Sequence, residues 1–411
     1  PMYIRDAAGN IMTDNRGYLR YDYGSDTNFS RENVIPNANP LASYMLDMMR
    51  YSGDVISGKW FADIDIWGGI KAKINIGVDA NNVRYTNMTN PFYGQYSETS
   101  GVGGLISVAS QRTFSTNQQY LLTYNKTFNR HSIDALLGTS WMREYYRYMT
   151  NSTINDLGGT DITGFQNEDG KISAGDSNAA LLSFFARVNY DYDNKYLLSL
   201  SIRRDESSKF HKDNRVGYFP SVSAGWNVHQ EKWFQNPVMS KLKIRASYGE
   251  LGANFLNPYN FDAIAYGPIP YTVGGERYVT GRAAYLKSKD LKWETAKTTD
   301  IGIELGFFNN DLTLSLDYFV KKNVDLLAQI DLNLSSGQIF EINSSREKPY
   351  VNTASVKNTG WEFMMNYRKQ LTKDFHIDAT FNIATLKNKV LSLGENVQPI
   401  TSGAMSSYFN D

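Results

Sequence analysis

The sequence predicts an all-β protein built of antiparallel strands, and three observations support this prediction. The 411 residues include 28 tyrosines, 21 phenylalanines, 7 tryptophans and 32 glycines, a composition that is typical of strands and turns rather than of helices. Apolar and polar residues alternate at a period of two over many segments. Short turn motifs and long polar stretches separate these segments in alternation.

The clearest hairpin lies within Leu181–Phe219. Two alternating runs flank the turn Asp193–Lys195, and each run has about the 9 to 11 residues that a tilted strand needs to cross a bilayer. Tyr190, Tyr192 and Tyr196 cluster beside the turn, where the aromatic girdle of a membrane barrel lies. Taken alone, the hairpin also fits a soluble sandwich, whose apolar face meets a second sheet.

Further strands follow the same rules along the chain. Besides the hairpin, strands are expected at Val55–Trp67, Ala72–Ala80, Gln118–Lys126, His131–Tyr146, Gly217–His229, Lys241–Gly249, Ala354–Lys369 and Phe375–Leu386, with another hairpin over Thr295–Val324. Loops are expected at Asn82–Thr116, Arg147–Asn178, Glu206–Val216, Glu250–Glu294 and Asp325–Thr353, after a loop-rich lead-in at residues 1–54 and before a polar tail that ends at Asp411.

Short and long connections therefore alternate through about a dozen strands, as periplasmic turns and extracellular loops do in outer-membrane barrels. A soluble sandwich rarely needs repeated loops longer than about 15 residues. The alternation favours a transmembrane β-barrel. The 42 basic residues balance the 42 acidic ones, so no basic field exists to bind nucleic acid. Without cysteine, neither disulfides nor thiolate metal sites hold the fold.

The sequence offers little for catalysis. Its four histidines, His131, His211, His229 and His376, lie in separate predicted hairpins, and neither H-E-x-x-H nor G-x-S-x-G occurs. Nucleophile, base and orienting acid must meet in a hydrolytic triad. We therefore expect a protein that is not an enzyme.

One loop resembles part of a calcium site. Asn167, Asp169 and Asp176 fall at positions 3, 5 and 12 around a turn glycine, but Phe165 stands at position 1 and cannot bind a cation. A polar turn is the expected structure and a Ca²⁺ site is the alternative. No other cofactor is expected.

The aromatic residues of the long loops are candidates for ligand contacts. These candidates are Tyr93, Tyr96, Tyr259, Tyr266, Tyr271 and Tyr278. Aromatic faces beside polar groups suit sugars or peptides, because a ring covers C–H surface while side chains fix hydroxyls or amides. The alternative is that these tyrosines pack the loops together or form the upper girdle.

An ordered series of motifs resembles the SusC/RagA family of TonB-dependent outer-membrane transporters. The matching stretches are Leu181–Tyr190, Lys195–Leu198, Arg204–Phe210, Gly217–Trp226, Leu242–Gly249, Leu291–Thr295, Asp317–Phe319, Leu326–Leu327 and Asn358–Phe363. Glu206 departs from the glycine that is more usual in the Arg-Asp-x-Ser-Ser motif, which affects only the expected shape of that turn.

The resemblance implies a barrel of about 22 strands in the outer membrane of a Gram-negative bacterium, with a plug, a TonB box and a SusD-like lipoprotein lid. We expect the plug domain and the C-terminal strands to be absent from these residues. Arg187, Arg203 and Asp205 would face the plug in the lumen, and the loop tyrosines would contact ligand or lid.

The implied function is import of oligosaccharides or peptides, energised by TonB, ExbB and ExbD. A siderophore or vitamin receptor and a passive porin or adhesin are the alternatives.

Overall fold

The computed structural model describes residues 3–14, 17, 19–22, 41, 44–45, 48–88, 104–155, 171–259, 261, 265–283, 288–329 and 350–393. This part of the chain is built almost entirely of β-strands. A single turn of 3-10 helix, η1, occupies Val228–Gln230. Among the described residues, no helix has the length and hydropathy required to span a membrane.

The strands are, in chain order, β1 Met48–Trp67, β2 Ile70–Met88, β3 Gly104–Phe128, β4 His131–Asn155, β5 Lys171–Tyr192, β6 Tyr196–Ser207, β7 Val216–Asn227, β8 Met239–Ala253, β9 Ala265–Val273, β10 Glu276–Ala283, β11 Glu294–Phe307, β12 Leu312–Gln329, β13 Tyr350–Gln370, β14 His376–Ala384 and β15 Lys387–Ser392.

Thirteen of these strands form one sheet in the order β1 to β8, then β11 to β14, with β15 also paired to β13. The pairs from β5 to β8 and from β11 to β15 are antiparallel. β9 and β10 form a separate two-stranded sheet. Strands that follow one another in the chain are neighbours in the sheet except where β8 pairs with β11 and where β15 pairs with β13. This arrangement confirms the predicted all-β, antiparallel class.

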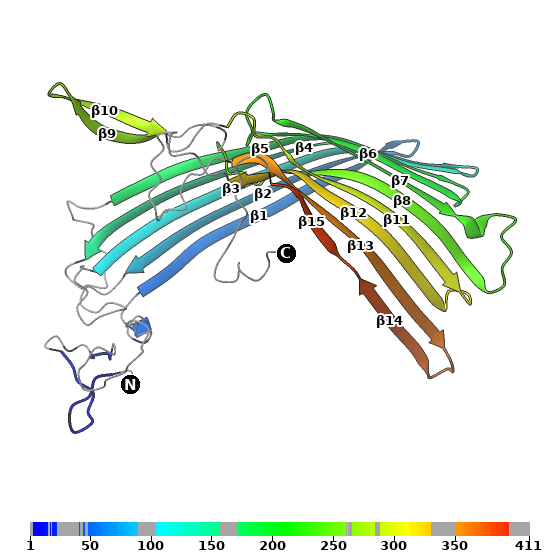
Figure 1. Ribbon diagram of the computed structural model, residues 1–411, viewed down its shortest axis with the longest axis horizontal. Coiled ribbons are helices and arrows are strands. Elements are labelled where there is room, and N and C mark those ends of the chain that lie inside the picture. The colour runs from blue at the N-terminus through cyan, green and yellow to red at the C-terminus, as the bar shows by residue number, and fades with distance from the viewer. Residues whose placement is uncertain are drawn as a thin grey trace. The chain divides into compact units, whose positions relative to one another are not determined.

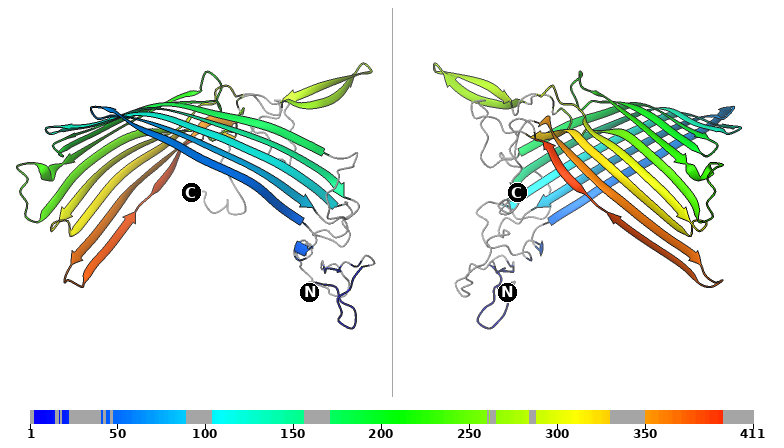
Figure 2. Two further views of the ribbon diagram at one scale, coloured as in Figure 1. Left: turned by 180° about the vertical axis from the view of Figure 1, so that it is seen from behind. Right: turned by 45° about the vertical axis from the view of Figure 1, so that its right-hand side comes forward.

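The chain divides into two compact units. The first comprises Pro1–Lys59, Gly77–Thr116 and Glu144–Asn178, and the second comprises Trp60–Ile76, Asn117–Arg143 and Ala179–Asp411. Within the second unit, β11, β12 and β13 lie side by side in Figure 1. The same strands are neighbours in both views of Figure 2.

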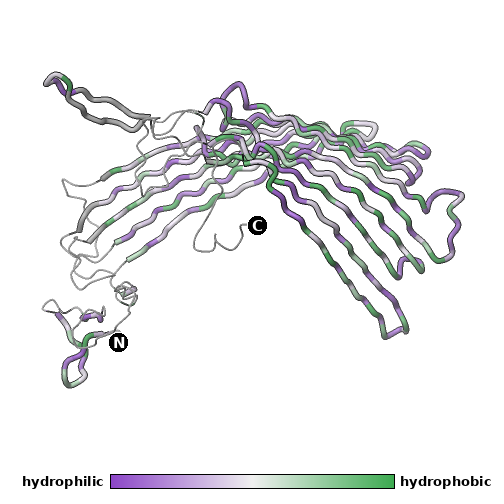
Figure 3. The backbone as a smooth tube through the Cα atoms, viewed as in Figure 1, coloured by the Kyte–Doolittle hydropathy of each residue, from purple (hydrophilic) through white to green (hydrophobic). Residues whose placement is uncertain are grey.

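Two short turns confirm the hairpins that the sequence predicts. Gly68 and Gly69 have φ angles of 63° and 93°, and Asp193 and Asn194 have φ angles of 58° and 53°. Two consecutive left-handed residues are the requirement of a type I′ turn, which matches the twist of paired strands. Figure 3 shows the accompanying alternation of hydrophobic and hydrophilic residues along β11 to β14.

The strands are longer than the hydropathy pattern predicts, so several predicted boundaries are wrong. β1 begins at Met48 instead of Val55, β2 and β3 extend into the predicted loop 82–116, and β4 and β5 extend into the predicted loop 147–178. The backbone ladder explains the difference, because N–H and C=O groups pair wherever a neighbouring strand continues, whether or not the side chains are apolar.

Two further predicted loops contain strands. The stretch 250–294 holds the β9–β10 hairpin, whose tip, Gly274 and Gly275, has φ angles of 63° and 86°. The tail holds β15, whose residues pair with the middle of β13. Each was missed because its polar or proline-containing sequence lacks a clean alternation.

Candidate functional site

The main sheet of the second unit has two chemically different faces. On β6, Leu198, Leu200 and Ile202 are 38%, 46% and 50% exposed, whereas Ser199 and Arg203 point to the other side. The register extends the apolar face to exposed Val222, Ile244, Ile301, Leu316, Trp361 and Phe381. Such a large exposed apolar surface requires an apolar surrounding. We call these two sides the apolar face and the charged face.

Aromatic side chains gather at the short turns beside the apolar face. The rings of Tyr192 and Tyr196 stack with centroids 6.2 Å apart, and those of Trp226 and Trp233 meet at 6.4 Å. The Tyr196 hydroxyl donates to the Glu231 carboxylate at 2.7 Å. An amphipathic ring with its polar end bonded toward water suits a membrane interface.

Glu231 lies in the connection between β7 and β8 and links it to the turn between β5 and β6. Besides the Tyr196 hydroxyl, its carboxylate accepts the Trp226 indole N–H at 3.2 Å and lies 3.7 Å from Lys195 Nζ. The hydrogen bond from Tyr196 and then that from Trp226 lower the pKa of Glu231 most. Burial opposes them with a smaller effect, and the charge of Lys195 lowers the pKa by less still. The turn therefore holds an ionised carboxylate at neutral pH.

On the charged face, Arg203 organises the first of two ion networks. Its Nε donates to both carboxylate oxygens of Asp205, at 2.7 and 2.8 Å, and its Nη2 donates to Ser183 Oγ at 2.8 Å. The guanidinium also lies over the Phe185 ring, 5.4 Å from the centroid. Arg187 lies on the same face, with Nη2 3.8 Å from Asp134 Oδ1. The three residues that the sequence singled out thus share one face.

Arg245 on β8 organises the second network. Its guanidinium nitrogens lie 3.0 Å from Asp300, 3.4 Å from Glu304 and 2.6 Å from Asp317. Gly302 lies opposite Arg245 in the ladder, and a Cβ there would press on the guanidinium and on Asp317. The lack of a side chain at Gly302 leaves the space in which Arg245 contacts Asp317.

The sequence interpretation missed this network. Lys241, Lys243 and Arg245 occupy alternate positions of β8, and the first two lie 2.7 and 3.8 Å from Glu304. The available signal was a row of three cations at alternate positions of β8. Asp300 and Glu304 on β11, the next strand of the sheet, are four residues apart and so lie on one face of that strand. The interpretation of this signal required the register between β8 and β11.

A cavity of about 610 Å³ lies on the charged face between these groups. On one side Asn189 Nδ2 donates to Asp134 at 3.0 Å, and on the other side stand Arg245 and Asp300. The floor consists of small residues, among them Ser199, Ser223, Gly225 and Ser247. The arrangement offers hydrogen-bond donors and acceptors to a polar chain, and it brings no nucleophile and base together.

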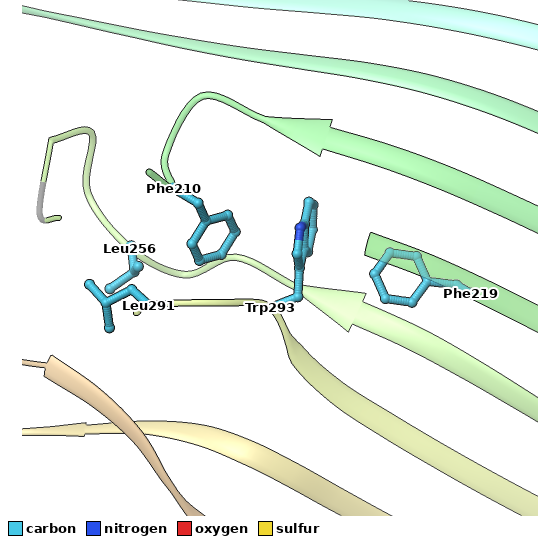
Figure 4. Packing of buried hydrophobic residues seen from close by; sticks show 5 residues of the cluster. All are labelled: Phe210, Phe219, Leu256, Leu291 and Trp293. Carbon is cyan, nitrogen blue, oxygen red and sulfur yellow. The ribbon is translucent and has the colours of Figure 1, made fainter. Parts of the chain in front are cut away.

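At the opposite end of the strands from the short turns, a buried cluster holds several connections together (Figure 4). It consists of Phe210, Phe219, Leu256, Leu291 and Trp293, and we call it the loop-base core. Figure 4 shows the Trp293 ring between Phe210 and Phe219, with centroid distances of 5.2 and 5.5 Å.

Polar contacts fix the loop-base core. The Trp293 indole N–H donates to the carbonyl of Arg215 at 2.9 Å, and the Arg215 side chain donates to the carbonyl of Phe210 at 3.1 Å. Asn352 accepts from the N–H of Lys292 and donates to its carbonyl, both at 2.9 Å, and donates to the carbonyl of Asp325 at 2.7 Å. Motifs that are distant in sequence thus meet in one structure.

The predicted ligand-contacting tyrosines lie in different places. Tyr259 is exposed and has a φ of 67°. Tyr266 and Tyr271 belong to β9 and Tyr278 to β10, where Tyr271 is paired with Tyr278, so these three stand on strands and not in an irregular loop. Tyr93 and Tyr96 lie outside the described residues.

The predicted calcium ligands remain largely outside the described residues, because only Asp176 is included. Its carboxylate lies 3.9 Å from Arg147 Nη2. In the part of the chain that the structure describes, no group of three or more metal-binding side chains occurs.

An antiparallel sheet with an exposed apolar face, an opposite charged face and alternating short and long connections defines the class of a transmembrane β-barrel wall. The family described as TonB dependent receptor-like, beta-barrel matches residues 3–403. The chain belongs to this family.

Individual relatives agree. TonB-dependent receptor P3 of Formosa agariphila is 30% identical over 87% of this chain and 35% of that protein. TonB-dependent receptor SusC of Bacteroides thetaiotaomicron is 27% identical over 91% of this chain and 36% of that protein. The RagAB peptide transporter structure shares the fold, with a TM-score of 0.76, 23% identity and coverage of 93% of this chain and 41% of that chain. The chain therefore spans about a third of the length of these curated relatives.

Proposed function

We propose that the protein to which this chain belongs imports oligosaccharides or peptides across the outer membrane, driven by the TonB–ExbB–ExbD system and assisted by a SusD-like surface lipoprotein. The observation that carries the proposal is the combination of an exposed apolar face with an internally bonded charged face in a chain of this family. In this proposal the apolar face contacts lipid and the charged face lines the lumen.

The charged face suits a wall against which a plug moves. Arg203 is paired with Asp205. The three carboxylates around Arg245 are balanced by Arg245 itself together with Lys241 and Lys243, so the wall presents little uncompensated charge. A wall of paired charges orients a polar partner without holding it permanently, because its ions are already compensated. We assign Arg187, Arg203 and Asp205 to the plug side of the lumen.

The cargo class rests on relatives and on chemistry. One relative carries the name SusC, and the fold is shared with a protein described as a peptide transporter. Tyr93, Tyr96, Tyr259, Tyr266, Tyr271 and Tyr278 are the proposed contacts to cargo or lid. The loop-base core supports this role, since it anchors the connections on either side of the β9–β10 hairpin.

A transport experiment on the full-length receptor tests the proposed cargo. Cells that carry the receptor are given labelled oligosaccharides, labelled peptides, an iron chelate or a vitamin, and uptake is measured at limiting concentration. We expect uptake of an oligosaccharide or a peptide, lowered by the double change Tyr271→Ala with Tyr278→Ala. Tyr218→Ala, which removes an exposed ring from β7, serves as the matched control and leaves uptake unchanged.

Uptake of the iron chelate or the vitamin alone would contradict the proposed cargo and select the siderophore or vitamin receptor. The lid is tested separately by purification from native membranes in mild detergent. We expect a surface lipoprotein to be recovered with the receptor in equal amounts, and a receptor recovered alone would contradict the partnership.

A further inference from the structure

The first unit carries a row of arginines that the proposed transport does not use. Arg50 on β1, Arg84 on β2, Arg112 on β3 and Arg147 on β4 are all exposed, and these four strands are successive neighbours in the sheet. Among the described residues, the first three have no ion-pair partner, and Arg147 has only Asp176 at 3.9 Å. We call these four residues the arginine row.

Contacts between β1 and β2 place the first two arginines on one face. The rings of Tyr51 and Tyr85 meet with centroids 4.8 Å apart, so odd-numbered positions of the two strands share one face. Because side chains alternate along a strand, even-numbered positions share the other face. Arg50 and Arg84 occupy such even-numbered positions, directly before Tyr51 and Tyr85.

Contacts between β3 and β4 place the other two directly opposite each other. Ser152 Oγ donates to Ser107 Oγ at 3.0 Å, which identifies a facing pair. Arg112 follows Ser107 by five residues on β3, and Arg147 precedes Ser152 by five residues on the antiparallel strand β4. They therefore face each other on the side away from the serines.

The link between β2 and β3 completes the row. The N–H of Asn125 on β3 donates to the carbonyl of Gly69, just before β2, at 3.0 Å. Odd-numbered residues of β3 are therefore paired with odd-numbered residues of β2. Even positions are then paired as well, so Arg84 and Arg112 share a face. All four arginines lie on one side of four consecutive strands.

This side is the apolar one. Along β2 the even positions nearer the turn carry Ile74, Ile76 and Val78, while the odd positions carry Lys71 and Lys73, whose side chains form ion pairs with aspartates of β1. Along β2, Arg84 therefore continues the series of even positions that includes Ile74, Ile76 and Val78, toward the end of the strand that carries the long connection.

We propose that the arginine row binds the phosphate groups of glycolipids in the outer leaflet of the outer membrane, an inference that rests on the membrane placement given above. Like charges directly opposite in a ladder repel. Asp176 lies beside Arg147 only, so a further anion that bridges Arg112 and Arg147 would relieve their repulsion. On the same side stand only two acids of these segments, Asp54 and Asp176. Guanidinium groups bind phosphate through two parallel hydrogen bonds, which makes arginine the fitting residue.

The test uses purified full-length receptor in uncharged detergent, titrated with diphosphoryl lipid A or with the same glycolipid after its phosphates are removed. The double variant Arg84→Gln with Arg112→Gln is compared with Lys126→Gln with Arg130→Gln, which removes two cations at the short-turn end. Attraction of about 1 kcal/mol for each basic residue predicts a roughly thirtyfold weaker binding of diphosphoryl lipid A by the first variant. The control variant binds as the unaltered receptor does.

Binding should also weaken with salt, since exposed charges are screened, and should be lost when the phosphates are removed. Equal affinity of the two double variants, or equal binding of the dephosphorylated lipid, overturns the proposal. If the first double variant does not fold, Arg84→Gln alone and the salt dependence of the unaltered receptor decide. Cargo uptake is measured on the same variants, so that a receptor that binds the lipid but imports nothing contradicts the transport proposal alone.

Discussion

Arg245 concentrates the charge of one face of the sheet, because a single guanidinium lies within 3.4 Å of Asp300, Glu304 and Asp317. Asp317 is buried, whereas Arg245 is partly open to solvent. Removal of the cation would take the guanidinium from Asp300 and Asp317, while Glu304 keeps Lys241 and Lys243. Removal of a whole ion pair would cost far less. The network therefore depends more on Arg245 than on any single acid.

The change Arg245→Met tests this dependence. We expect the free energy of unfolding of the full-length receptor to fall by about 2 kcal/mol, a value below that of a fully buried pair because solvent screens the partly exposed cation. A lower free energy of unfolding lowers the unfolding temperature. This temperature is measured as the point at which the heated receptor changes from the fast migration of the folded form to the slower migration of the unfolded form on a detergent gel.

Lys321→Met is the control, since Lys321 is exposed and has no ion-pair partner among the described residues. Its effect should stay within about 0.5 kcal/mol. Equal effects of the two changes would show that Arg245 does not hold the carboxylates together.

Gly252 gives a second test at the scale of single residues. A Cβ at this position would press on the Phe219 ring of the loop-base core, whereas a Cβ at Gly225 would meet only ordinary contacts of 3.4 to 3.5 Å. We expect Gly252→Ala to destabilise the receptor by about 1 to 3 kcal/mol through overpacking, measured by the same gel assay. Gly225→Ala is the matched control, and a loss of stability as large as that of Gly252→Ala would contradict the packing argument.

At the scale of elements, each end of the strands has its own anchor. The connection between β7 and β8 is held by Glu231, which accepts hydrogen bonds from Tyr196 and Trp226. The opposite end is held by the loop-base core, in which Trp293 bonds to the backbone of Arg215. One anchor is polar and lies at the girdle, and the other is apolar and buried, so the two should respond differently to pH.

The pH dependence follows from the lowered pKa of Glu231. A carboxylate with a folded pKa below its ordinary value of 4.5 contributes stability that is present above that value and is lost as the pH falls through the folded pKa. Relative to Glu231→Gln, the unaltered receptor should unfold at a higher temperature at neutral pH, and this advantage should vanish in acid.

Asp374→Asn, in the exposed turn between β13 and β14, controls for the loss of a carboxylate at a short turn. An advantage that persists or grows in strong acid would contradict the assigned role of Glu231.

The sequence allowed the hairpin elements to be predicted wherever alternation was clean and turn residues were explicit, as at Gly68–Gly69 and Asp193–Asn194. It also indicated that Arg203 and Asp205 share a face, since they lie two positions apart on one strand. It could not predict the ends of β2 to β5, because backbone pairing does not depend on the hydropathy of the side chains. The Arg245 network was missed because three strands contribute to it, and only the register brings them together.

At the scale of the whole molecule, the two faces are the property that connects the sequence to the proposed transport. Alternation along each strand separates the residues of the apolar face from those of the charged face, and the antiparallel register aligns the two sets across the sheet. In the described residues the sheet path ends at β1 and at β14, and β15 pairs with the same strand, β13, as β14 does. Unpaired strand edges are unfavourable in lipid, which is why each experiment proposed here uses the full-length receptor.

At this scale the central proposal is that TonB drives import through the full-length receptor. The most direct measurement is uptake of the identified cargo by cells that carry the full-length receptor, with TonB present, with TonB deleted, and with the proton gradient collapsed. We predict that accumulation against a concentration gradient is lost in the last two conditions while surface binding of cargo persists. Uptake that continues unchanged without TonB or without the gradient would contradict coupled transport and identify a passive porin.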